Sequence, residues 1–106
     1  MKKVKFADPL PNLVLDSSKN TTWRINDSKN ITADDILSLC HNDENEFAKA
    51  KVISVRETTF GELTSHDKEG HEKFSGDEEM YKTYSGYYNI QVTPKTKLKV
   101  IKFKLI

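Results

Sequence analysis

The chain has 106 residues, of which 36% are hydrophobic, and its 17 Lys and Arg against 16 Asp and Glu give a formal net charge of +1. This length supports one domain with one modest core. The near-neutral charge excludes a protein that coats polyanions through its overall field. Cys40 is the only cysteine, which excludes an intrachain disulfide and favours a reducing, cytoplasmic compartment. No apolar run is long enough for a membrane span, so we expect one domain over residues 1–106 without membrane insertion.

The first segment predicts a short strand followed by a short helix. Lys3–Phe6 alternates as a strand, and Asp8 followed by Pro9 predicts an N-cap and a first helical residue. The helix is expected to end near Asp16. Its apolar residues recur at spacings of three and four, which predicts one core-facing stripe made of Leu10, Leu13 and Val14.

The second predicted strand, Thr21–Ile25, carries the most informative residues of the chain. Side chains on a strand point to opposite faces in turn, so Trp23 faces the core while Thr22 and Arg24 project from the other face. Lys19 lies in the turn that precedes this strand. A lysine, a hydroxyl and an arginine beside a hydrophobic wall predict a site for an anionic or hydrogen-bonding ligand, against the plainer alternative of a solvated strand edge.

A β-hairpin and a last strand are expected to form the rest of the sheet. Ile36–Cys40 predicts a strand that is packed on both sides, and Phe47–Val55 predicts its longer partner. In the longer strand the apolar phase changes between Val52 and Ile53, which predicts a bulge. The last strand changes phase between Val100 and Ile101, and such changes are typical of strands that bend around a small barrel.

The segment Glu57–Tyr88 predicts a mostly helical insertion between the hairpin and the last strand. Thr58 or Thr59 is expected to cap a turn over Phe60–Leu63, and Ser75–Glu78 reads as a capping box that opens a helix ending near Ser85-Gly86. This helix is expected to bury Met80, Tyr81 and Tyr84, and to leave Tyr87 or Tyr88 for the rim of a cleft. The spacing of His66, Glu69 and His71 matches no common zinc motif, so we expect two exposed histidines and no metal.

Lys19, Thr22 and Arg24 fall at the spacing Lys-x-x-Thr-x-Arg, with Ser17 two positions before the lysine, and Asp34-Asp35 precedes the third predicted strand. These elements resemble the motifs of the ASCH domain family, which belongs to the PUA-like superfamily. Glycine is usual in the family where Ser17 and Asp34 stand here. The resemblance extends over essentially the whole chain and also includes residues 48–52, 62–64 and 100–105.

The resemblance implies an α+β fold: a small PUA-like β-barrel with a short N-terminal helix and a helical insertion. It also implies a cleft lined by Lys19, Thr22 and Arg24. The superfamily is associated with RNA binding and recognition of modified bases, so RNA or a modified nucleoside is the expected partner, and no cofactor is expected. The lysine-rich last strand is then expected to help guide an RNA backbone.

An alternative implied by the resemblance is an amidohydrolase that removes the acetyl group from N(4)-acetylcytidine. Small members of the family look like such enzymes and use a lysine, a threonine and a glutamate. Lys19 and Thr22 match the first two, and the glutamate is Glu72 or Glu69. Lysine acts as a base only when burial or a cation lowers its pKa. The carboxylate would then protonate the leaving amine, while Arg24 or a backbone amide would bind the oxyanion.

Overall fold

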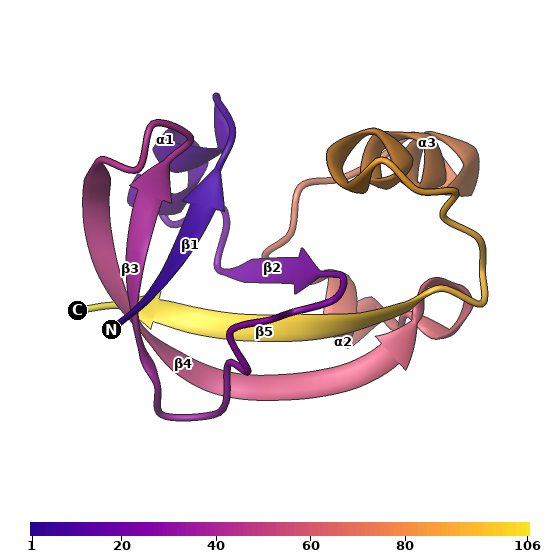
Figure 1. Cartoon of the computed structure of the whole chain (residues 1–106). Helices are drawn as coiled ribbons and strands as arrows, with labels where there is room; N and C mark the ends of the chain where they lie inside the picture. The colour runs from indigo at the N-terminus through magenta and orange to yellow at the C-terminus, as the bar shows by residue number, and fades with distance from the viewer.

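The computed structural model describes residues 1–106 and contains one curved sheet of five strands in the order β1-β3-β4-β5-β2. β1 runs parallel to β3, and the other neighbouring pairs are antiparallel. Figure 1 shows the long strands β4 and β5 curving across the molecule. The strands are β1 (Lys2–Phe6), β2 (Thr21–Arg24), β3 (Ile36–His41), β4 (Glu46–Thr59) and β5 (Lys97–Leu105).

The helices lie where the sequence predicted a short N-terminal helix and a helical insertion. α1 spans Leu10–Leu15, and the insertion holds the 3-10 turn η1 (Phe60–Glu62), α2 (Ser65–Lys68) and α3 (Asp77–Tyr88). The insertion begins at Phe60 and not at Glu57, because β4 stays paired with β5 as far as Thr59. None of these helices has the length and apolar character that crossing a membrane requires.

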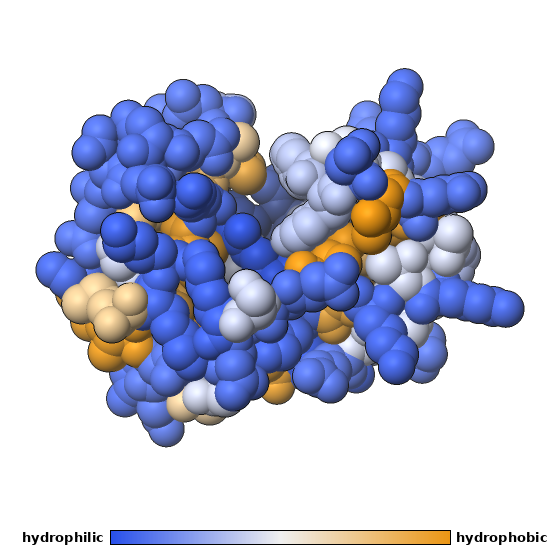
Figure 2. All heavy atoms as spheres, viewed as in Figure 1, coloured by the Kyte–Doolittle hydropathy of each residue, from blue (hydrophilic) through white to orange (hydrophobic).

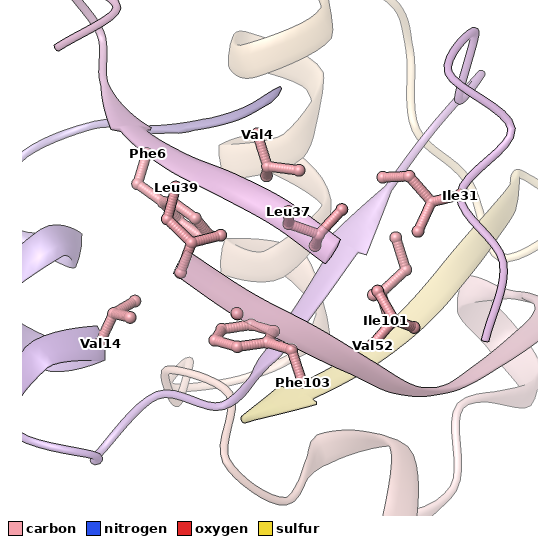
Figure 3. Close-up of a cluster of buried hydrophobic side chains, with 10 residues drawn as sticks. Val4, Phe6, Val14, Ile31, Leu37, Leu39, Val52, Ile101 and Phe103 are labelled. Carbon is pink, nitrogen blue, oxygen red and sulfur yellow. The ribbon is translucent and has the colours of Figure 1, made fainter. Parts of the chain in front are cut away.

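One hydrophobic cluster, here called the barrel core, fills the space between the curved sheet and α1. Figure 3 shows its side chains converging from β1, β3, β4 and β5. None of its members carries a polar side-chain atom, and Phe6 packs against the Phe103 ring with the two centroids 6.4 Å apart. The barrel core consists of Val4, Phe6, Val14, Ile31, Leu37, Leu39, Ala50, Val52, Ile101 and Phe103.

A second cluster, here called the aromatic cluster, lies on the other face of β5 beneath α3. The Trp23 ring meets the Phe60 ring edge-on, with the two centroids 6.2 Å apart. Two members, Trp23 and Tyr84, carry polar atoms within this apolar surrounding, and each of those atoms makes a hydrogen bond. The aromatic cluster consists of Trp23, Ile25, Phe60, Met80, Tyr84, Val92, Leu98 and Val100.

The two phase changes in the sequence have different structural causes. In β4 the pairing register shifts between Val52 and Ser54, which confirms the predicted bulge. Ile53 is the extra residue of this bulge, and its side chain is 56% exposed. β5 has no register shift between Val100 and Ile101. Both of its faces are covered there, because Val100 belongs to the aromatic cluster and Ile101 to the barrel core.

Three predicted helix ends were wrong. α1 begins after Pro9, with no side-chain cap from Asp8. α3 begins after Gly76 without the predicted capping box, since Glu79 rather than Glu78 reaches back to the backbone N–H of Ser75. The same helix continues through Ser85-Gly86 to Tyr88, because burial of Tyr84 and packing of Tyr88 outweigh the roughly 1 kcal/mol cost of a helical glycine. The chain's capping box instead opens α2.

Side chains bridge the gap between the two edge strands of the sheet. The Arg24 guanidinium at the end of β2 donates to the Lys5 carbonyl of β1 at 2.9 Å. The Lys29 ammonium, from the loop after β2, donates to the Lys3 carbonyl of the same edge strand. The half-barrel is therefore joined along this seam by cationic side chains and not by strand pairing.

Candidate ligand-binding cavity

A cavity of about 330 Å³ opens between the β1–α1 side of the molecule and α3. Its volume lies at the small end of the range for pockets that enclose small molecules. Figure 2 shows the surface hollowed between these two parts of the molecule. The cavity brings together the three residues of the motif, Lys19, Thr22 and Arg24, with Glu72 from the loop after α2.

Lys19 lies just before β2, as predicted, but its side chain is only 3% exposed. Its ammonium donates to the Thr21 carbonyl and to Glu72 Oε1, both at 2.8 Å. An ammonium carries three donors, so one position of Nζ has no protein partner. Burial lowers the pKa of Lys19 to about 8, against the opposing attraction of Glu72. Lys19 therefore loses its proton at a lower pH than an exposed lysine does.

Glu72 is the ionised partner of this lysine. Its Oε1 accepts from Lys19 at 2.8 Å and lies 2.7 Å from His71 Nδ1. Burial alone would raise the pKa of Glu72, but the hydrogen bond from His71 and the charge of Lys19 outweigh it and lower the pKa to about 2. Its second oxygen makes no hydrogen bond. Because no buried polar side-chain atom lacks a partner, that oxygen is accessible to a ligand.

The alternative glutamate, Glu69, points away from the cavity. Its side chain is 72% exposed and lies 3.5 Å from His66, which is also exposed. Only its backbone takes part in the surroundings of β2, where the Glu69 carbonyl accepts from the Thr21 hydroxyl at 2.6 Å. Of the two glutamates left open by the sequence, the structure places Glu72 alone beside Lys19.

Thr22 and Arg24 share one wall of the cavity. Arg24 Nε donates to Thr22 Oγ1 at 3.1 Å, and the guanidinium lies over the Phe6 ring at 5.1 Å from its centroid. The Thr22 hydroxyl accepts this bond and has no partner for its own proton, so it remains a free donor toward the cavity. Both faces of β2 are buried at this point, and the alternative of a solvated strand edge was wrong.

His71 is the residue that sequence reasoning missed, since we expected it to be exposed. Its side chain is 1% exposed and its ring stacks on Trp23 with the two centroids 3.7 Å apart. Nδ1 faces Glu72, and Nε2 lies 2.8 Å from the Tyr84 hydroxyl. The available signal was its position directly before Glu72. The spacing within the His66 to His71 segment gave no sign that the two histidines have opposite exposures.

Tyrosines of α3 form the wall opposite the motif. Tyr87 is exposed and Tyr88 is half-buried, and both line the cavity together with Tyr84. The sequence left open which of Tyr87 and Tyr88 would lie at the rim, and the structure places both there. Aromatic faces of this kind suit a planar ring.

The lysines of β5 do not line this cavity. Lys99 pairs with the Asp27 carboxylate at 3.1 Å, and Lys102 donates to Thr21 Oγ1 and the Glu69 carbonyl. The expectation that this strand guides a backbone toward the cleft therefore lacks geometric support.

Two loops keep the backbone shape that glycine favours although the glycines are absent. Ser17 has φ of 69° and Asp34 has φ of 72°, both in the left-handed region. These are the two positions where the ASCH motifs usually have glycine. Both residues therefore hold a conformation that glycine adopts without a steric penalty.

Comparison with solved structures shows which fold this is. The sequence matches no family model and no curated protein. An ASCH domain from Lactobacillus crispatus superposes with a TM-score of 0.66 at 13% identity, covering 98% of this chain and 79% of that one. An Enterococcus faecalis protein assigned to DUF984 gives 0.79 at 14% identity, covering 100% and 76%. A hypothetical protein gives 0.77 at 23% identity, covering all of both chains.

Proposed function

From the premise that this chain has the fold of the ASCH domain, we propose that its cavity binds a modified nucleoside or a modified base of RNA. The observation that carries the proposal is the buried Lys19 ammonium, which pairs with the partly exposed Glu72 at 2.8 Å in a cavity that Thr22 also lines. A lysine charge buried to this extent is a costly feature for stability alone. A cavity that retains one favours a ligand that uses it.

The free hydrogen-bonding positions describe the ligand. Lys19 and Thr22 each have one free donor, and Glu72 has one free acceptor oxygen. A ligand with a carbonyl and an N–H on one edge satisfies all of them, and its planar ring fits against Tyr87 and Tyr88. Nucleobases with an amide or exocyclic amine offer this combination.

The charge layout favours recognition of the base over recognition of the backbone. The chain's net charge is +1, and the lysines of β5 lie away from the cavity. An RNA ligand would then neutralise only about two to four phosphates, giving a shallow dependence of affinity on salt. A free nucleoside would show almost none.

Calorimetric titration with N(4)-acetylcytidine, cytidine and a short RNA, at low and moderate salt, tests the binding proposal. We expect Lys19→Met and Thr22→Val to lower affinity at least tenfold, because each removes a free donor. Lys97→Met is the matched control, since it removes the same charge from an exposed site outside the cavity. Equal losses in Lys19→Met and Lys97→Met, or no binding of any of the three ligands, would contradict the proposal.

Hydrolysis of an N(4)-acyl cytidine is a second candidate, favoured by the pKa of Lys19. A pKa lowered to about 8 leaves a fraction of the amine neutral at neutral pH. The neutral amine has two N–H donors, and the Thr21 carbonyl and Glu72 accept both. Its lone pair then occupies the position without a protein partner, where a base must be.

The reaction then runs as acyl transfer. Lys19 takes the proton from the Thr22 hydroxyl, whose oxygen attacks the amide carbon while Arg24 stabilises the oxyanion. The Lys19 ammonium returns the proton to the departing amine, and water hydrolyses the acyl-threonine to release the acid. A pKa of about 2 keeps Glu72 ionised, so it orients Lys19 and does not protonate the leaving amine, contrary to the role expected from sequence.

Acetate release from N(4)-acetylcytidine, followed across pH, separates hydrolysis from binding. Activity should rise as pH increases through about 8, where Lys19 loses its proton. Lys19→Arg keeps the positive charge but cannot act as a base, so turnover should stop while binding persists. Thr22→Ala should also stop turnover. A Lys19→Arg variant as active as the parent, or wild-type protein that binds without releasing acetate over hours, would leave binding alone.

A further inference from the structure

A continuous line of polar contacts runs behind the cavity from α3 to Lys19. The Tyr84 hydroxyl lies 2.8 Å from His71 Nε2. His71 Nδ1 lies 2.9 Å from the Glu72 main-chain carbonyl, its hydrogen-bond acceptor, and 2.7 Å from Glu72 Oε1. The same Glu72 oxygen accepts from Lys19 at 2.8 Å. Tyr84 and His71 are both buried, and His71 is held flat against Trp23 at an interplanar angle of 13°. The ring therefore has little freedom to turn away from its partners.

The chemistry of the partners fixes every proton along this line. Glu72 is ionised and can only accept, so His71 Nδ1 must be the donor. Burial lowers the pKa of His71 against the pull of Glu72, so the ring is neutral and Nε2 carries a lone pair. Burial also raises the pKa of Tyr84, which keeps its hydroxyl proton. Tyr84 therefore donates to His71, and His71 donates to Glu72.

We propose that Tyr84 and His71 are positioning residues, which hold the Glu72 carboxylate against Lys19 so that the amine keeps one free position facing the ligand. The proposal deepens the proposed function, since it explains how the ligand-facing lysine is oriented. Glu72 belongs to a loop without regular secondary structure and is part-exposed. Without His71 as a second fixed group beside Oε1, this carboxylate would be free to rotate toward solvent.

Other charged and titratable groups also face Lys19, and the test must separate them from this line of contacts. Arg24 disfavours the ammonium by charge repulsion, while Glu72 favours it. Neither Arg24 nor Lys5 contacts His71 or Tyr84 by a hydrogen bond, so substitutions at Tyr84 leave those groups in place. The groups around the cavity are Glu72, His71, Arg24, Lys5, Tyr84, Tyr87 and Tyr88.

The decisive variant is Tyr84→Phe, which removes one oxygen and keeps the ring in the aromatic cluster. Without the Tyr84 hydroxyl, the buried Nε2 loses its hydrogen-bond partner, and the ring loses the contact that holds Nδ1 toward Glu72. The bond to Glu72 then weakens and Lys19 loses part of its counterion. We expect Lys19 to titrate at a pH lower by about one than in the wild-type protein. Tyr81→Phe is the matched control on the same helix, because the Tyr81 hydroxyl makes no hydrogen bond, and it should leave the titration unchanged.

The titration is measured by NMR of 13C-labelled lysine side chains, with the Lys19 signal identified by its loss in Lys19→Arg. This readout needs neither ligand nor turnover. It can therefore contradict the role of Tyr84 and His71 while the proposed function stands, and the proposed function can be contradicted while this role stands. His71→Asn, whose amide can still donate to Glu72 from near the Nδ1 position, should keep the titration closer to wild type than His71→Leu. An unchanged or raised titration in Tyr84→Phe, or an equal shift in Tyr81→Phe, would overturn the proposal.

Discussion

The barrel core and the aromatic cluster lie on opposite faces of β5 and differ in the types of residue that they contain. The barrel core contains only aliphatic residues and phenylalanine, so shape alone determines its packing. The aromatic cluster contains Trp23 and Tyr84, and the buried His71 stacks on its Trp23. Aromatic residues with polar atoms can supply both apolar contact and hydrogen bonds. Trp23 and Tyr84 therefore pack within the aromatic cluster and are at the same time partners of the buried His71.

The largest effect should come from Trp23→Ala, because Trp23 both packs within the aromatic cluster and stacks on His71. Removing a buried aromatic side chain costs about 3–5 kcal/mol. The same change deprives His71 of its stacking partner, so we expect the Lys19 titration and ligand affinity to change as well. Denaturant unfolding and NMR titration measure the two effects. Loss of stability with an unchanged Lys19 titration would show that Trp23 serves packing alone.

Leu39→Ala should produce a comparable or smaller loss of stability without any change at the cavity. Leu39 is fully buried in the barrel core, and truncation of such a residue costs about 2–5 kcal/mol. Leu39 belongs to no hydrogen-bonded side-chain network, so Lys19 in the folded protein should titrate as in the wild type. Chemical denaturation and the same NMR experiment provide the check. An altered Lys19 titration would mean that the two clusters are mechanically coupled.

Acid should weaken the cavity side of the protein, since the barrel core contains no ionisable group. Glu72 has a folded-state pKa of about 2, below its ordinary value of 4.5. Its stabilising contribution is therefore complete above pH 4.5 and is lost as the pH falls toward 2. We expect a loss on the order of 2 kcal/mol, because one pKa unit corresponds to about 1.4 kcal/mol and the carboxylate is partly exposed.

Melting temperatures measured between pH 6 and 2 test this expectation, with Glu72→Gln as the comparison. The variant should be less stable at neutral pH and should show a flatter decline in acid. Asp67 contributes a similar decline in both proteins, because its hydrogen bonds from Arg56 lower its pKa to about 2. Parallel curves for the two proteins would show that Glu72 does not titrate with folding.

The smallest effect should be a gain from Ser17→Gly. Ser17 has φ of 69°, and glycine adopts this conformation without a steric penalty. Relief of that penalty exceeds the greater entropy of glycine in the unfolded chain, so we expect a stabilisation of about 0.5–1 kcal/mol. Thermal unfolding is the measurement, and we expect the packing of both clusters to stay as in the wild-type protein. A destabilised variant would mean that the Ser17 side chain has a role in the turn before Lys19.

The sequence predicted the sheet well because alternation and covered faces are local properties. The bulge after Val52 and the doubly buried strand β3 both follow from apolar phase. The phase change at Val100 led to a wrong prediction of a local bend. A strand with both faces covered and a strand with a bend produce the same change in apolar phase. Helix ends were less predictable. The continuation of α3 past Gly86 depends on tertiary packing of Tyr88, which no local signal encodes.

The candidate site was predicted in part. Spacing brought Lys19, Thr22 and Arg24 together because all three lie on or next to one short strand. Glu72 and His71 come from a loop distant in sequence, and their position depends on how that loop packs on Trp23. The polar sequence around His71 predicted that its side chain would be exposed. Its burial follows from partners that become neighbours only in the folded chain.

The cationic seam between the edge strands has a consequence for association between molecules. Carbonyls two residues apart on a strand point the same way, so those of Lys3 and Lys5 lie along one side of β1. The side chains of Lys29 and Arg24 already occupy them. An edge strand with free carbonyls offers a template for a strand from another chain, which is a route to aggregation. Here that route is blocked from within the molecule, by the same arginine that forms part of the cavity wall.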